Sequence, residues 1–232
     1  MSYREPPSVP DDVLDEGSWT KFDERRGRTT RSLLGLARVT AYHHTDVYGD
    51  DAIRREVADK TLGRVDRHLS VFFVNRTNLV PGVQNLLGST SRRQLAPAVR
   101  SLARSKLEDE LRSRGVEGFR VFGKHDVRGS DGRKVELQRV EAEYVVRDAE
   151  IELVDGVSAS FEGGKLDVNC WVGAWIESDD VYVVGGVHPA EDFERTRYVE
   201  LSDAVSVRID VDLGLWPRPY RQKMFELLRA VV

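Results

Sequence analysis

The sequence predicts an α+β domain in which a mainly antiparallel, meander-rich sheet is flanked by about three helices, like an α/β sandwich. Short runs of alternating apolar residues recur between residues 119 and 187, separated by turn sequences, which is typical of antiparallel strands. Residues 94–114 and the segment after Pro219 instead carry apolar residues at helical spacing. A chain of 232 residues with 40% hydrophobic and 32% charged residues can bury a core of this size.

The first part of the chain is expected to hold a leader, a strand and a helix. Residues 1–16 combine prolines with acidic residues, so we expect a flexible leader, followed by a single α+β domain over residues 17–232. Residues 32–48 are rich in β-branched and aromatic side chains, which favours a strand that ends at Gly49. Asp50 then suits the N-cap of a helix.

The middle of the chain is expected to hold an interior strand, a long helix and a meander. Residues 69–74 are apolar on both faces, and the helix over 94–114 ends before Gly115, which suits a left-handed cap. In the meander over 119–187, the apolar phase shifts within one strand and suggests a bulge near Gln138.

The last part of the chain predicts a central strand and a sealing helix. Residues 166–176 are apolar on one face and carry Trp171 and Trp175 on the other, so both faces should be covered. A hairpin is expected around the turn at 155–156, and a final strand over 205–213. The terminal helix should cover the sheet with Tyr220, Met224, Leu227, Leu228 and Val231.

The charge distribution suggests one partner class without establishing it. The net charge is −4, yet residues 21–40 and 91–114 each carry an excess of basic side chains. These segments could present a basic face to an anionic partner, although solvated flanks are the commoner origin of such segments. The first segment lacks interleaved aromatic residues, so we do not expect nucleic acid as the partner.

Motifs that would carry chemistry are incomplete in this sequence. The Gly-Gly-Lys at 163–165 has Ala159 and Leu166 where a phosphate-binding loop needs glycine and Ser or Thr. The single cysteine, Cys170, lies in an apolar strand pattern and is expected to be buried. His43 and His44 are adjacent, so in a strand they point to opposite faces and cannot both bind one ion without a kink. The sequence therefore predicts no catalytic residue, cofactor or metal site.

The expected location is the cytoplasm. The N-terminal residues lack the apolar segment of an export signal, and no apolar run approaches the roughly 20 residues of a membrane-spanning helix. A lone cysteine agrees with a reducing compartment.

Four segments of the sequence resemble an uncharacterised domain family of halophilic archaea. They are DVYGD at 46–50, FFVNRT at 72–77, GGVHPAEDF at 185–193 and DVDLGL at 210–215, followed by Tyr220 and Arg221. The resemblance spans about residue 17 to the end and implies no known activity, cofactor or catalytic residue. Many members of that family carry an export signal with a lipid-attachment cysteine, and this sequence has neither.

The leading hypothesis for the function is a non-enzymatic binding or accessory domain with a small-molecule or protein partner. If a ligand binds, the residues expected to meet it are Arg76, His188 and Trp216, because each is a large side chain beside a predicted strand end. Two alternatives stay open. One is an enzyme whose site assembles only in three dimensions, and the other is binding of an anionic partner through the Arg-rich segments.

Overall fold

A computed structural model describes most of the chain. The described residues are 3–33, 37–60, 63, 66–82, 92–146, 149–154, 157–161, 164–190, 194–202, 205–212 and 217–232.

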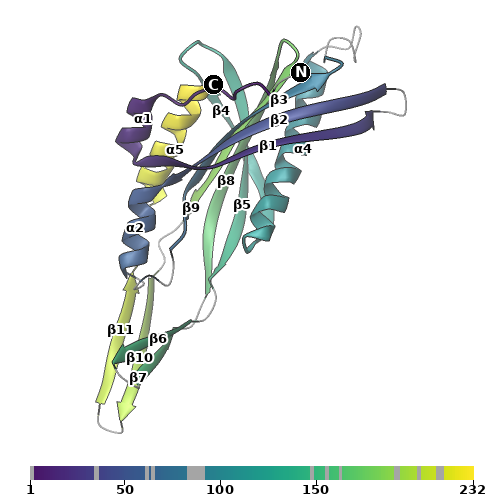
Figure 1. Cartoon of the computed structure of the whole chain (residues 1–232). Coiled ribbons are helices and arrows are strands. Elements are labelled where there is room, and N and C mark those ends of the chain that lie inside the picture. Colours follow the sequence, from purple (N-terminus) through teal and green to yellow (C-terminus); the bar gives the residue numbers. More distant parts are fainter. Residues whose placement is uncertain are drawn as a thin grey trace.

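The body of the fold is a seven-stranded antiparallel sheet (Figure 1). Its strands lie in the order β1-β2-β3-β9-β8-β5-β4, and every neighbouring pair is antiparallel. The mainly antiparallel α+β class predicted from the sequence is therefore confirmed. The strands are β1 (Trp19–Leu33), β2 (Ala37–Asp50), β3 (Val71–Val80), β4 (Val116–Arg128), β5 (Lys134–Val146), β8 (Gly164–Glu177) and β9 (Asp180–Pro189).

Two separate hairpins extend from one end of this sheet, at the bottom of Figure 1. The first, β6 (Ala149–Val154) with β7 (Val157–Phe161), is the hairpin predicted around residues 155–156. The second pairs β10 (Glu194–Ser202) with β11 (Val205–Asp212), of which only the second strand was expected.

The described residues form four helices rather than about three. They are α1 (Asp11–Gly17), α2 (Asp51–Lys60), α4 (Arg92–Ser113) and α5 (Pro217–Val231). The buried carboxylate of Asp50 accepts hydrogen bonds from the backbone N–H groups of Ala52 and Ile53, so it is the expected N-cap of α2. Gly115, two residues after the end of α4, has a φ of 88°, which is the left-handed conformation that glycine adopts without steric cost.

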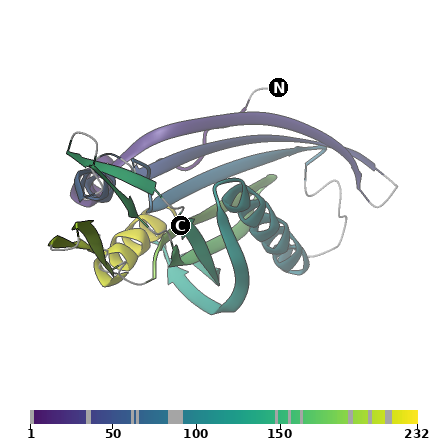
Figure 2. The ribbon, with the colours of Figure 1, turned by 90° about the horizontal axis from the view of Figure 1, so that it is seen from below.

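Helices α4 and α5 pack on opposite faces of the sheet, with β8 and β9 between them (Figures 1 and 2). On β8, Val168 and Cys170 belong to the core beside α4, whereas Trp171 belongs to the core beside α5. This period-2 alternation is what the sequence predicted for a strand covered on both faces. Leu227 and Leu228 of α5 are fully buried, and burial of each such side chain contributes about 1.5–3 kcal/mol.

The expected strand over residues 32–48 is wrong in its bounds. The chain instead forms two strands of a long hairpin, β1 and β2, and β1 was not expected at all. Much of β1 is charged and exposed, because it is the edge strand of the sheet. An edge strand with little apolar alternation gives no period-2 signal in the sequence.

The bulge expected near Gln138 is also not found. Pairing of β5 with β8 is continuous from Leu137 to Val146, and the irregularities lie in β4. Val135 and Leu137 point into the core beside α5, whereas Val140 and Ala142 point into the core beside α4. The apolar phase of β5 therefore shifts because the first part of the strand packs one face into the core beside α5, and the later part packs the other face into the core beside α4.

The segment before β1 packs against the domain. Val9 is buried in the core beside α5, and Val13 and Leu14 of α1 pack against that core. Residues 3–9 run from the N-terminal end across the same face of the sheet towards α1 (Figure 1). The described part of the expected leader is thus in contact with the sheet, while the domain boundary at residue 17 stays a prediction.

Candidate functional site

A transverse row of five side chains crosses the sheet on the face that also carries α5. Antiparallel register aligns Arg26 of β1 with His44 of β2, His44 with Arg76 of β3, Arg76 with Tyr182 of β9, and Tyr182 with Trp175 of β8. Directly paired residues of neighbouring strands point to the same face, so the five lie side by side. We call this set the transverse row.

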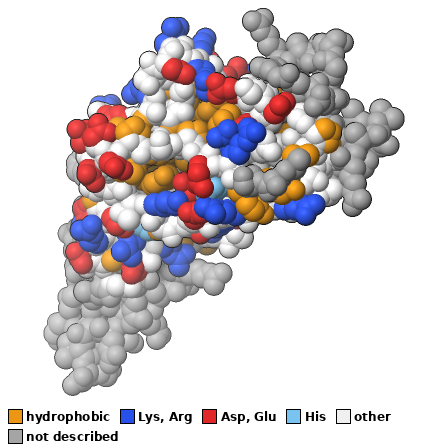
Figure 3. Space-filling view, turned by 45° about the horizontal axis from the view of Figure 1, so that its top comes forward, with side chains coloured by type: hydrophobic (Ala, Val, Ile, Leu, Met, Phe, Trp, Pro, Cys, Tyr) orange, Lys and Arg blue, Asp and Glu red, His pale blue; other side chains and the backbone are white. Residues whose placement is uncertain are grey.

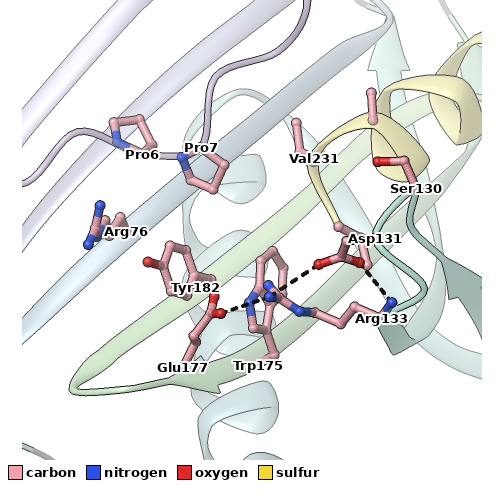
Figure 4. Close-up of a pocket in the computed structure, with 12 residues that line it drawn as sticks. Pro6, Pro7, Arg76, Ser130, Asp131, Arg133, Trp175, Glu177, Tyr182 and Val231 are labelled. Carbon is pink, nitrogen blue, oxygen red and sulfur yellow. Dashed lines mark hydrogen bonds and ion pairs between the residues drawn. The ribbon is translucent and has the colours of Figure 1, made fainter.

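A pocket of about 350 Å³ lies over the aromatic end of the transverse row (Figure 4). The rings of Trp175 and Tyr182 are stacked, with centroids 5.1 Å apart and planes 9° from parallel. Pro6 and Pro7 lie along one side of the pocket in Figure 4, and the end of α5 and the β4–β5 turn along the other. The lining residues are Pro6, Pro7, Arg76, Ser130, Asp131, Arg133, Trp175, Glu177, Tyr182, Ala230, Val231 and Val232.

Two arginines flank the aromatic pair. The guanidinium carbon of Arg76 lies 5.4 Å from the ring centroid of Tyr182, and that of Arg133 lies 5.6 Å from the ring of Trp175. Both distances are within the range of cation–π attraction. Arg133 is held in place by Glu177, whose carboxylate lies 2.8 Å from its Nη2. The result is a row of two rings and two cations at the pocket.

Burial shapes the polar groups of this pocket. It raises the pKa of Tyr182, so the phenol stays neutral. The indole Nε1–H of Trp175 is buried and has no hydrogen-bond acceptor among the described residues. A buried N–H without a partner costs free energy, so this indole is a point of strain below the pocket.

The N-terminal segment 3–9 forms one wall of this region. The backbone carbonyl of Glu5 accepts a hydrogen bond from Arg76 at 3.1 Å, and the ring of Tyr3 packs edge-on against Tyr42 at 5.7 Å. Arg4 donates to Asp180 at 2.9 Å. Residues 3–9 thus lie over β2, β3 and β9 and reach from the transverse row into the pocket.

A second group of polar side chains lies at the other end of the transverse row. One ligand-type atom from each of Glu24, His44 and Asp46 lies within 4.8 Å of the others. Two of these residues come from β2 at positions two apart, and the third comes from β1 across the hairpin. Among the described residues this is the group whose composition suits a metal ion.

The structure separates the three residues expected to meet a ligand. Arg76 lines the pocket. His188 is buried in the core, where its Nε2 accepts a hydrogen bond from Trp171 and its Nδ1–H donates to the carbonyl of Pro189. Burial lowers its pKa to about 4, which fits this neutral tautomer. Trp216 lies outside the described residues.

Sequence reasoning missed three of the main pocket residues, namely Trp175, Tyr182 and Arg133. Trp175 was noticed only as a marker of a covered strand. Its pairing with Tyr182 could have been predicted from the sequence. A tight hairpin pairs residues that are equidistant from its turn, and Trp175 and Tyr182 are equidistant from the turn at Ser178 and Asp179.

Over the residues that the structure describes, the first basic segment places its arginines on both faces of the sheet. Arg25 is ion-paired with Glu110 of α4 at 2.8 Å, whereas Arg28 lies over Tyr42 on the opposite face of the sheet. Figure 3 shows Lys, Arg, Asp and Glu side chains interspersed on the surface in view. This arrangement does not favour an anionic polymer as the partner.

Fold and site together define an α+β domain with a small, arginine-flanked aromatic pocket. The chain belongs to the DUF6517 family, a domain family of unknown function, whose model matches residues 6–231. No curated protein and no solved structure matches the chain. None of the described helices is long and apolar enough to cross a membrane.

Proposed function

We propose that this chain is a non-enzymatic binding domain and that its ligand is a small organic anion with a planar ring. The observation that carries the proposal is the pocket in which Arg76 and Arg133 flank the stacked rings of Tyr182 and Trp175. A pocket of about 350 Å³ lies at the small end of the range for ligand sites, which suits a molecule of one or two rings.

The polar groups at the pocket favour a ligand that accepts hydrogen bonds. Arginine carries five N–H donors, and Arg76 uses three of them on Asp180 and on the carbonyl of Glu5. Guanidinium donors at the pocket suit a carboxylate, while the aromatic rings and Val231 suit a flat apolar body.

The same residues favour binding over catalysis. The described residues that line the pocket include neither His, Cys nor Lys. The two carboxylates, Asp131 and Glu177, are both ion-paired with Arg133, at 3.3 and 2.8 Å. A general acid or base needs a proton-transferring group positioned towards the substrate, and these carboxylates point towards a cation instead (Figure 4).

A thermal-shift titration tests the proposal with aromatic carboxylates and their neutral amides as probes. Benzoate and indole-3-acetate should raise the melting temperature, and benzamide and indole-3-acetamide should not, because the amides lack the charge that Arg76 and Arg133 recognise. Arg133→Gln should weaken binding roughly tenfold or more, since a hydrogen bond to a charged group contributes about 1.5–3 kcal/mol.

A matched control is Arg120→Gln. Arg120 is ion-paired with Glu141 on a different part of the sheet and is 75% exposed, so its loss should leave probe binding unchanged. Binding of the amides as tightly as the acids would remove the anionic part of the proposal. Binding that is unaffected by both Arg133→Gln and Trp175→Phe would place the ligand elsewhere, and no shift with any probe would contradict the proposal as a whole.

The origin and location of the protein belong to the same proposal. The four resembling segments support a halophilic archaeal source, and the single cysteine, Cys170, agrees with the reducing compartment of the cytoplasm. Fractionation of expressing cells with an antibody to the protein tests the location.

A further inference from the structure

His44 is a buried histidine surrounded by carboxylates. Its side chain is 0% exposed. Its Nε2 lies 3.2 Å from Oε1 of Glu24 and 3.4 Å from Oδ1 of Asp46, and its Nδ1 lies 3.3 Å from Oε2 of Glu5. None of these approaches has the angles of a hydrogen bond, so both ring nitrogens of His44 are buried without one among the described residues. A buried imidazole in this state indicates a missing partner.

Two of the three spacings among the ligand atoms of Glu24, His44 and Asp46 match a tetrahedral metal centre. Zinc binds histidine nitrogen and carboxylate oxygen at about 2.0–2.2 Å, so two ligand atoms of one tetrahedral ion lie roughly 3.4 Å apart. The distances from His44 Nε2 to the oxygens of Glu24 and Asp46 are 3.2 and 3.4 Å. The side chain of Glu24 is 38% exposed, which leaves a route for the ion and a fourth position for water.

Glu5 is placed to supply the outer contact that such histidines usually have. A metal-bound imidazole normally donates its other ring N–H to a carboxylate, which fixes the tautomer and orients the ring. The carboxylate of Glu5 lies on the Nδ1 side of His44, opposite the side that faces Glu24 and Asp46. It comes from the N-terminal segment 3–9, so an ion at His44 would also hold that segment against the sheet.

The local charge favours a bound cation, and the ammonium group of Lys21 would compete with a metal ion for Asp46. Three carboxylates, Glu5, Glu24 and Asp46, surround the imidazole, whereas two cations contact them. The first cation, Lys21, has its Nζ 2.7 Å from Asp46 Oδ1. The second, Arg26, has its Nη2 2.8 Å from Glu24 Oε1. Because Lys21 is partly exposed and flexible, its ammonium group can leave Asp46 to a divalent ion.

We propose that Glu24, His44 and Asp46 bind one divalent transition-metal ion of the zinc type, with Glu5 orienting His44. The site is separate from the aromatic pocket and does not depend on the function proposed for it. The adjacent pair of His43 and His44 did not predict this site from the sequence, because His43 is not one of the proposed ligands. The proposed ligands are His44 and Asp46, which lie two residues apart on β2, and Glu24 on β1.

Isothermal titration calorimetry of the full chain with Zn²⁺ tests this proposal. We expect one ion per chain, and Co²⁺ should give the visible absorption of a four-coordinate site. Glu24→Gln, His44→Gln and Asp46→Asn should each weaken binding at least tenfold, and Glu5→Gln about ten- to a hundredfold. Lys21→Met should strengthen binding, because it removes the competing ammonium group. A merely structural role for the cluster would not produce that gain.

His43→Gln is the matched control. His43 is the neighbouring histidine, but it points to the other face of the sheet and lies against Gly27. Its loss should leave zinc affinity unchanged. Thermal melts show which variants fold. If His44→Gln does not fold, Glu24→Gln still tests the proposal, because the side chain of Glu24 is 38% exposed. Binding without saturation at one ion per chain overturns the proposal, as does zinc affinity that Glu24→Gln leaves intact or that His43→Gln removes.

Discussion

Arg76 of β3 and Asp180 of β9 form an ion pair with two hydrogen bonds beside the pocket. The Nε and Nη2 of Arg76 donate to the same oxygen of Asp180, at 2.9 and 2.6 Å. Asn78 donates to the other oxygen at 2.7 Å, and Arg4 adds a further bond at 2.9 Å. The side chain of Asp180 is only 2% exposed. Through these hydrogen bonds its carboxylate joins β3, β9 and the N-terminal segment.

Asp180→Ala should destabilise the fold by about 2–4 kcal/mol, because it leaves Arg76 and Asn78 without their acceptor. Burial alone would raise the pKa of Asp180, but hydrogen bonds from Asn78, Arg76 and Arg4 outweigh it and lower the pKa. The stabilisation is therefore full above the unfolded pKa of about 3.9 and is lost as the pH falls through the lower folded value. Urea denaturation at neutral and acidic pH measures both effects.

The control for this prediction is Asp126→Ala. Asp126 is ion-paired with Lys134 at 2.7 Å, but both side chains are more than half exposed. Such pairs contribute about 0–1 kcal/mol. A loss at Asp180 no larger than the loss at Asp126 would show that the buried pair does not stabilise the sheet.

His188 should make the stability depend on pH between about 6.5 and 4. Its folded-state pKa is lowered to about 4, mainly by burial, whereas the unfolded histidine titrates near 6.5. Within this window the unfolded chain binds a proton that the folded chain does not, so the free energy of unfolding falls as the pH falls. His188→Gln should flatten this part of the profile in urea denaturation. An unchanged slope would mean that His188 is not the group responsible.

Sequence patterns predicted those helices and strands whose caps or apolar spacing lie within the element itself. Helix α2 is defined by the cap at Asp50, α4 ends before Gly115, and α5 shows an apolar stripe that the structure buries. The strand β8 was recognised because both of its faces are covered. Each of these signals lies within a few residues along the chain, and sequence reasoning can read such signals.

Pairing across the sheet was not predictable in the same way. The edge strand β1 is ordered by its partner β2 rather than by its own apolar residues, so it was missed, and Glu24 was missed with it. The aromatic pocket depends on the register that aligns Arg76, Tyr182 and Trp175 from three strands. Of these, only Arg76 was singled out beforehand as a binding residue. Register is a property of the assembled sheet, and a single strand does not contain it.

Gly186 on β9 should not tolerate a side chain, because α5 crosses the strand there. A Cβ at this position would lie 2.4 Å from Sδ of Met224 and 2.5 Å from the backbone oxygen of Val71. Met224 is flexible but fully buried, and the oxygen belongs to the paired strand, so neither can move freely. Gly186→Ala should therefore cost about 1–3 kcal/mol in urea denaturation. Gly123→Ala is the matched control, since a Cβ there meets nothing within 4 Å, and it should change stability little. Equal effects of the two substitutions would contradict the close packing of α5 on β9.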